Sequence, residues 1–222
     1  MNSSSHPPSR PLLSLRDAQV TTTDGTTLLT VEELDLHPGD RVVVTGPSGS
    51  GKSMLLRTLA GRWEPGLRFT GERVAGFDRT GFVPQRGLDA LHPLARLASQ
   101  LRRVTGSTPA RVTEVLHAVG LTDDALHRRR PTEMSGGQQQ RAAVALATLT
   151  EAPLILADEP TSALDHETRD QTLAMLLGVV DPEQVLVVAT HDGAVAERLA
   201  TRHLRVRQGE ILEIPVDAEV PA

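Results

Sequence analysis

The 222-residue chain has no cysteine and no tyrosine, and aromatic residues make up only 2% of it. Without cysteine it can form neither disulfides nor thiolate metal sites. No apolar run reaches the roughly 18 residues of a membrane span, and residues 1–11 lack the apolar segment of a secretory signal. The net charge of -5 disfavours a nucleic-acid binder that acts through bulk electrostatics. We therefore expect a soluble protein with no nucleic-acid partner.

Lysine is nearly absent as well, because Lys52 is the only lysine among 23 Lys and Arg residues. It lies in GPSGSGKS, which fits G-x-x-x-x-G-K-[ST] in full. A β-branched run, Arg41 to Thr45, predicts a buried strand before this motif, and a helical pattern starts at Met54 after it. This context identifies a P-loop, whose backbone N–H groups and helix N-terminus bind phosphates. Lys52 is expected on the β- and γ-phosphates, where the planar fork of arginine would not fit, and Ser53 on Mg²⁺.

Apolar runs that alternate with helical patterns indicate the fold class. Buried strands are predicted at Leu154–Ala157 and Val185–Ala189, and helical patterns follow at Glu167–Leu177 and Gly193–Ala200. Such alternation favours a doubly wound parallel α/β sheet. Leu12 to Asp40 is typical of antiparallel strands, with a turn at Asp24-Gly25.

The segment between Gln85 and Glu133 has no strand-like run. It shows helical spacing at 94–103 and 110–119, which predicts a small helical subdomain inserted into the α/β core. The expected organisation is a disordered tail at 1–11, one domain at 12–214 (core 12–84 and 138–214, helical subdomain 85–137) and a short tail at 215–222.

Polar residues end two of the predicted strands, as expected at a ligand-binding sheet edge. Asp158 suits the Mg²⁺ shell, usually through water, and Glu159 is placed to polarise the attacking water. His191 follows the next strand and could hydrogen-bond the γ-phosphate. The alternative is a solvated turn and a structural histidine. A GTPase is excluded, since its N-K-x-D motif needs a second lysine.

Six motifs in order resemble the ATP-binding subunit of an ABC (ATP-binding cassette) transporter over about residues 12–213. They are GPSGSGKS, FVPQ (Phe82–Gln85), MSGGQQQR (Met134–Arg141), LILADEP (Leu154–Pro160), SALD (Ser162–Asp165) and ATHD (Ala189–Asp192). The resemblance implies a P-loop NTPase (RecA-like) fold with an N-terminal antiparallel β subdomain. It also implies ATP hydrolysis, with ATP and Mg²⁺ bound between two cassettes that pair head to tail.

The resemblance also implies a role for each motif residue. Asp158, Ser53 and Gln85 serve Mg²⁺, Glu159 is the catalytic base, and His191 is the switch histidine. Gln85 also reports to the membrane subunits, and SALD lies at the dimer seam. The implied phosphate-binding residues in the same chain are Gly46, Pro47, Ser48, Gly49, Ser50, Gly51, Lys52, Ser53 and Met54. The implied residues that cap the partner's γ-phosphate are Ser135, Gly136, Gly137 and Gln138.

The residues of MSGGQ support this role on physical grounds. Ser135 and Gln138 fit a helix capping box, which is also a purely structural explanation. A cap does not need two consecutive glycines, because glycine costs backbone entropy. Close approach to a phosphate does need them, with the helix dipole aimed at the anion.

Two positions and one segment depart from the family pattern. Met134 stands where leucine is usual, and Met54 where threonine is usual, which removes one polar contact near the α-phosphate. No aromatic residue occurs from Met1 to Arg62, although the family usually stacks adenine on one, roughly where Val20 to Asp24 lie. We expect an aliphatic or threonine surface under the base and weaker selectivity for adenine.

The segment after Gln85 is similar to that of dipeptide, oligopeptide and nickel importer ATPases. Leu91-His92-Pro93 corresponds to their L-N-P-like triplet, and a Gln-Leu helix follows. Those subunits usually carry a C-terminal extension, and other importers or small exporters share the remaining motifs. Expected partners are a second cassette, identical or not, integral membrane permeases and, in an importer, an extracellular solute-binding protein. The expected location is peripheral, on the cytoplasmic side of the cell membrane.

Two other classes of ABC protein are weighed against a transporter. A soluble ABC ATPase that acts on DNA or ribosomes would need a coiled-coil insertion or a second cassette. A non-hydrolysing regulatory cassette would normally lose the base or the switch, yet Glu159 and His191 are present. Both comparisons favour the transporter ATPase. The sequence does not indicate the transported substrate.

Overall fold

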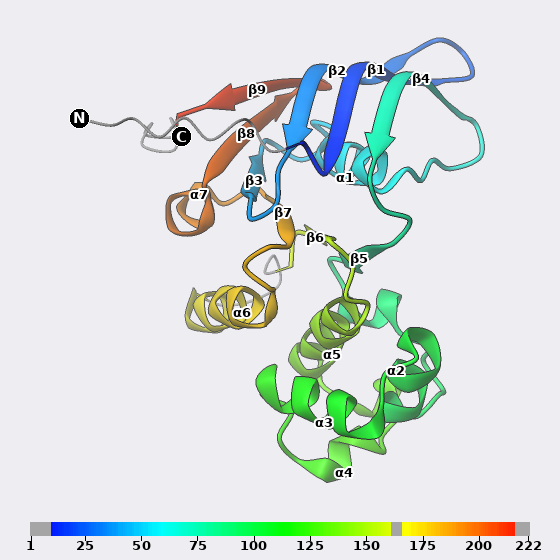
Figure 1. Ribbon diagram of the computed structural model, residues 1–222, viewed down its shortest axis with the longest axis vertical. Helices are drawn as coiled ribbons and strands as arrows, with labels where there is room; N and C mark the ends of the chain where they lie inside the picture. The colour runs from blue at the N-terminus through cyan, green and yellow to red at the C-terminus, as the bar shows by residue number, and fades with distance from the viewer. Residues whose placement is uncertain (1–9, 161–165, 216–222) are drawn as a thin grey trace.

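The computed structural model describes residues 10–160 and 166–215. Figure 1 shows a curled sheet at one end of the molecule and a group of helices at the other, joined through α5. The strands are β1 (Leu13–Thr22), β2 (Thr27–Leu36), β3 (Arg41–Thr45), β4 (Leu67–Ala75), β5 (Thr80–Val83), β6 (Leu154–Asp158), β7 (Val185–Thr190), β8 (Arg202–Arg207) and β9 (Glu210–Ile214). The α-helices are α1 (Lys52–Ala60), α2 (Leu97–Thr105), α3 (Pro109–Ala118), α4 (Asp124–His127), α5 (Gly136–Leu149), α6 (His166–Val179) and α7 (Gly193–Leu199), with short 3-10 turns at Gly87–Ala90 and Pro131–Glu133.

The described strands form one nine-stranded sheet in the order β4-β1-β2-β9-β8-β3-β7-β6-β5. From β8 to β5 all neighbours are parallel, which confirms the predicted parallel core. β1 pairs antiparallel with β2 and β4, and the chain reverses between β1 and β2 through Gly25, whose φ is 89°. The predicted N-terminal antiparallel strands and their turn are therefore confirmed.

Of the parallel strands, β3, β6 and β7 are buried on both faces along most of their length, which explains their apolar runs. Successive side chains of a strand point to opposite faces. Val42 and Val44 thus pack with α1 and the antiparallel strands, whereas Val43 packs with the core that contains residues of α5, α6 and α7. The two apolar cores therefore cover β3 on both of its faces.

The helical part of the fold lies beyond β5, in the segment predicted to be helical. Figure 1 shows α2, α3 and α4 gathered around the far end of α5. Buried Gln100 on α2 fixes the loop before it, because its side chain accepts from His92 N at 2.8 Å and donates to Ala95 O at 3.0 Å. The Leu91-His92-Pro93 triplet is thereby held in one conformation.

Within the described residues, no helix combines the length and the apolar character needed to cross a bilayer.

Candidate nucleotide-binding site

The P-loop connects β3 to α1, and close backbone packing requires its glycines. A Cβ on Gly46 would lie 2.3 Å from the carbonyl oxygen of Val206 on β8, so no larger residue fits there. Gly51 caps α1 with φ 113°, a conformation that other residues rarely adopt. Thr45, the residue before the loop, places Oγ1 2.7 Å from Nε2 of buried His203. Burial lowers the pKa of His203, which favours a neutral imidazole beneath the loop.

The ammonium of Lys52 is held at the mouth of the P-loop. Its side chain is only 5% exposed, and Nζ donates to the carbonyl oxygens of Gly46 at 2.9 Å and Pro47 at 3.1 Å. Nζ also lies 3.3 Å from Oε1 of Glu159. A buried ammonium needs such partners. They hold it beside the pocket that Lys52 lines.

Glu159 lies between the P-loop lysine and the histidine of the neighbouring strand. Its backbone has φ 43°, and its N–H donates to Ala189 O on β7 at 2.8 Å. This bond fixes the turn after β6. The carboxylate has Oε1 toward Lys52 and Oε2 3.2 Å from Nδ1 of His191. Three residues from separate motifs therefore meet through one ion pair and one hydrogen bond.

Asp158, Ser53 and Gln85 face the same pocket, which has a volume of about 380 Å³. Burial raises the pKa of Asp158, and the hydrogen bond with Ser53 opposes that rise. A carboxylate, a hydroxyl and a side-chain amide provide the oxygen ligands that Mg²⁺ prefers. The donor set fits this ion. The residues that line the pocket are Leu28, Ser48, Gly49, Gly51, Lys52, Ser53, Met54, Gln85, Asp158 and Glu159.

None of these lining residues is aromatic. The apolar side chains at the pocket come from Leu28 on β2 and Met54 on α1. Val20 to Asp24, where the surface under the base was expected, do not line this pocket, so that surface stays a prediction.

The MSGGQ segment begins α5 and does not line the P-loop pocket. Ser135 is the N-cap, with its backbone N–H 3.0 Å from Gln138 Oε1 and its Oγ 3.3 Å from the Gln138 N–H. The predicted capping box is confirmed. A Cβ on Gly136 or Gly137 would meet nothing within 4 Å. The packing of the described residues therefore does not explain why both positions are glycine.

Gln85 connects the P-loop pocket to the start of α5. It also lines a second pocket of about 390 Å³ together with Gly136 and Gly137. Gln140, a residue missed in the sequence reasoning, donates from Nε2 to Pro84 O at 3.1 Å. Gln139 donates to Pro131 O at 2.8 Å. Gln140 thus ties α5 to the segment that carries Gln85, and Gln139 ties it to the turn before the helix. The only sequence signal for these two residues was their position beside MSGG.

The remaining predicted seam motif, Ser162–Asp165, lies outside the described residues.

Comparison with known proteins identifies the family. The ABC transporter family model matches residues 29–162. The macrolide export ATP-binding/permease protein MacB of Marinobacter nauticus is 33% identical over 96% of this chain and 36% of its own length. The Fe(3+) ions import ATP-binding protein FbpC 3 of Rhodococcus jostii is 36% identical over 88% of this chain and 60% of its own length. The chain therefore spans less than two thirds of either relative.

Solved structures agree with this result. A dimeric ATP-binding cassette in a post-hydrolysis state, bound to ADP and Pi, superposes with a TM-score of 0.75 at 26% identity. The match covers 93% of this chain and 100% of that one. Because the family model also covers more than half of the sequence, this chain belongs to the ABC transporter family as an ATP-hydrolysing ATP-binding domain.

Proposed function

We propose that the chain binds Mg-ATP in the P-loop pocket, hydrolyses it as one of a pair of cassettes, and drives a solute across a membrane through permease partners. The convergence of Lys52, Ser53, Gln85, Asp158 and Glu159 on one pocket carries this proposal. These groups match what phosphoryl transfer to water requires, namely positioning and charge stabilisation.

The phosphates of ATP would bind at the N-terminus of α1, where the helix dipole and the Lys52 ammonium are both positive. Asp158, Ser53 and Gln85 would hold Mg²⁺, which supplies further charge against the phosphate oxygens. Glu159 accepts the proton of the attacking water. His191, hydrogen-bonded to Glu159, orients this carboxylate and the γ-phosphate.

The second half of each site would come from a partner cassette. Ser135, Gly136 and Gly137 lie outside the chain's own P-loop pocket. The two glycines leave open backbone at the positive end of a 14-residue helix. Such a surface suits the γ-phosphate bound to another chain.

The proposed permease contact is the segment from Gln85 to Leu101. Leu94 is 66% exposed there, on the loop that Gln100 holds in place. On the Leu91-His92-Pro93 triplet we propose an importer of the dipeptide, oligopeptide or nickel type, with a solute-binding protein as a further partner. An exporter is the alternative, since one relative is a macrolide export protein and another an Fe³⁺ import protein.

Paired catalysis has a direct kinetic test. We expect phosphate release per chain to rise with protein concentration at saturating Mg-ATP, because each site needs a second molecule. The rate should level off once the pairs are complete. The protein is then diluted to concentrations at which it is monomeric but still binds ATP. A rate per chain that stays constant under these conditions would contradict the shared site.

Transport and its direction need the membrane partners. The tagged chain should co-purify with integral membrane proteins from detergent-solubilised membranes of its own cells. In vesicles made with these proteins, ATP should move solute toward the cassette side for an importer and away from it for an exporter. If no ATP-dependent solute movement accompanies hydrolysis in such vesicles, the transport proposal fails.

Nucleotide selectivity is expected to be weak, because Leu28 and Met54 offer only apolar contact to a purine. Stacking on an aromatic side chain is worth about 1–3 kcal/mol per base in nucleic-acid systems, and the pocket has no such side chain. GTP should displace a fluorescent ATP analogue at a concentration within about tenfold of ATP, which is about 1.4 kcal/mol. Much tighter binding of ATP would show that specific contacts to adenine exist.

A further inference from the structure

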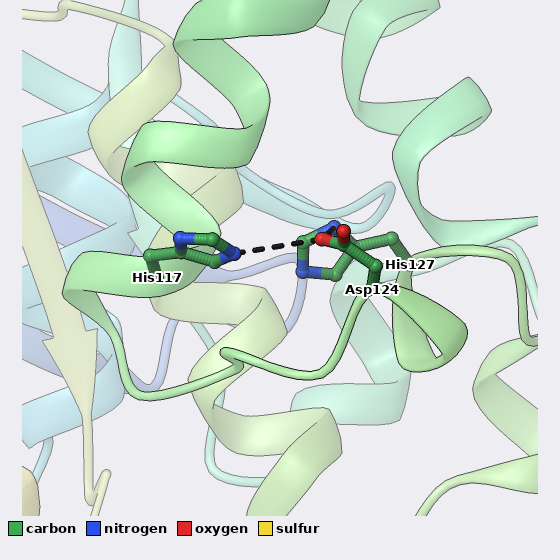
Figure 2. Close-up of side chains that lie close together, drawn as sticks. All are labelled: His117, Asp124 and His127. Carbon is green, nitrogen blue, oxygen red and sulfur yellow. Dashed lines mark ion pairs between the residues drawn. The ribbon is translucent and has the colours of Figure 1, made fainter.

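Two histidines and an aspartate meet in the helical part of the fold, away from the P-loop. His117 lies in the last turn of α3, and Asp124 and His127 are the first and last residues of α4. Figure 2 shows the three side chains turned toward one another. Nε2 of His117 is 3.6 Å, and Nδ1 of His127 3.5 Å, from Oδ1 of Asp124. In the described part of the chain, they form the only group of three such residues with ligand atoms all within 4.8 Å of one another.

These distances are close to those of a metal site. Ligand atoms bound to tetrahedral Zn²⁺ at about 2.0–2.1 Å lie about 3.3–3.4 Å apart. The two distances to Asp124 already approach this value. The remaining one, between the two imidazoles, is at most 4.8 Å. His117 is 45% exposed, so a modest rotation of its side chain can close this gap.

The hydrogen bond of His127 selects the tautomer that binds metal. Nε2 of His127 lies 2.7 Å from the carbonyl oxygen of Leu121. A carbonyl oxygen can only accept, so Nε2 must carry the proton. In the neutral ring the lone pair is then on Nδ1, the atom that faces Asp124. Metal-binding histidines usually donate their other N–H to a carbonyl or carboxylate in this way, which fixes the ring and raises its basicity.

The backbone around the cluster is well anchored. His127 is buried, and the apolar side chains of Leu116, Leu121 and Leu126 belong to the core. Leu121 N–H donates to Leu116 O at 2.8 Å, which fixes the turn between α3 and α4. Asp124 is 73% exposed, so an ion can enter from solvent and keep a water ligand.

We propose that His117, Asp124 and His127 bind a divalent transition-metal ion of the Zn²⁺ class, with water in the fourth position. Imidazole suits Zn²⁺, Ni²⁺, Co²⁺ and Cu²⁺, and the absence of thiolates argues against a soft-metal site. The ion links the end of α3 to α4. The turn between them also contacts α5, because Arg141 donates to Gly120 O at 3.4 Å. A bound ion would therefore also stiffen the turn against which α5, the helix capped by Ser135, packs.

The test is Zn²⁺ binding by isothermal titration calorimetry on the full chain, in excess Mg²⁺ and without nucleotide. The wild type should bind one Zn²⁺ at this site. The H117Q and D124N variants should lose at least about tenfold in affinity, because even an outer-shell change costs about 10–100-fold. Both side chains are exposed, so the variants should fold, which circular dichroism checks.

Matched controls separate this site from general surface binding. The H92Q and D78N variants make the same chemical changes at exposed positions elsewhere and should bind Zn²⁺ as the wild type does. With Co²⁺ as the probe, the visible absorption of a low-symmetry nitrogen–oxygen site should appear in the wild type and the controls and be lost in H117Q and D124N. No Zn²⁺ binding by the wild type, or a loss below tenfold in H117Q and D124N, overturns the proposal.

Discussion

Replacement of Glu159 by glutamine is expected to lower the rate of ATP hydrolysis by about 10²–10⁴-fold, the usual contribution of a general base. Glutamine keeps the size of the side chain but cannot take a proton from water. The turn that positions it should persist, because it is fixed by the backbone bond from Glu159 N–H to Ala189 O. The measurement is phosphate release at saturating Mg-ATP.

ATP binding should survive this change or become tighter. Glu159 Oε1 lies 3.3 Å from Lys52 Nζ and therefore competes with phosphate for the same ammonium. Glutamine removes the negative charge and this competition. The variant should accumulate as an ATP-bound pair of cassettes, seen as a dimer by gel filtration with ATP.

The matched control is Glu32→Gln, the same chemical change at an exposed position of β2. It should hydrolyse ATP at the wild-type rate. Unchanged turnover in Glu159→Gln would reject Glu159 as the base and direct attention to Asp158, which is held by Ser53 and has a raised pKa because of its burial.

The centre of the fold could be predicted because its physical signals are local. β3 has the predicted bounds Arg41–Thr45, and β6 and β7 each extend one residue beyond the prediction. These strands are buried on both faces, so the run between their polar end residues is continuously apolar. The P-loop adds glycines whose positions are set by backbone contacts, such as that between Gly46 and Val206.

The edge strand β4 and the central strand β8 lie outside the predicted elements for the opposite reason. β4 is exposed or half-buried along its whole length, and Arg202 and Arg205 interrupt the apolar pattern of β8. Arg202 is held there by Glu213 on the next strand at 2.7 Å and by Asp40, which is distant in sequence, at 3.0 Å. Periodicity cannot reveal strands whose stability depends on such pairs.

Side-chain clusters were predictable only where a motif marked them. Lys52, Glu159 and His191 come from three separate segments, and their motifs predicted a shared site before the sheet brought them together. His117, Asp124 and His127 carry no motif, and only the turn between α3 and α4 makes them neighbours. The motifs also describe ATP chemistry, which importers and exporters share, so they leave the transport direction open.

Replacement of Ser135 by arginine is expected to abolish paired hydrolysis while ATP binding stays near the wild-type level. Ser135 lies outside the pocket of its own chain, so the nucleotide does not meet the new side chain there. In the pair, the long cation would occupy the space that Gly136 and Gly137 keep open and hold the partner's phosphate away from the helix N-terminus. The measurements are ATP affinity by fluorescence titration and phosphate release.

Loss of the helix cap alone is a competing explanation, because removal of an N-cap side chain costs about 0.5–2 kcal/mol of stability. Thr108→Arg is the matched control: Thr108 is the exposed N-cap of α3, and its hydroxyl accepts from Arg111 N–H at 3.3 Å. This variant should lose a similar amount of stability and keep its hydrolysis rate. Ser135→Thr, which preserves a capping hydroxyl, should also remain active. If both arginine variants hydrolyse ATP equally well, Ser135 is only a cap and the γ-phosphate of the partner is held by other residues.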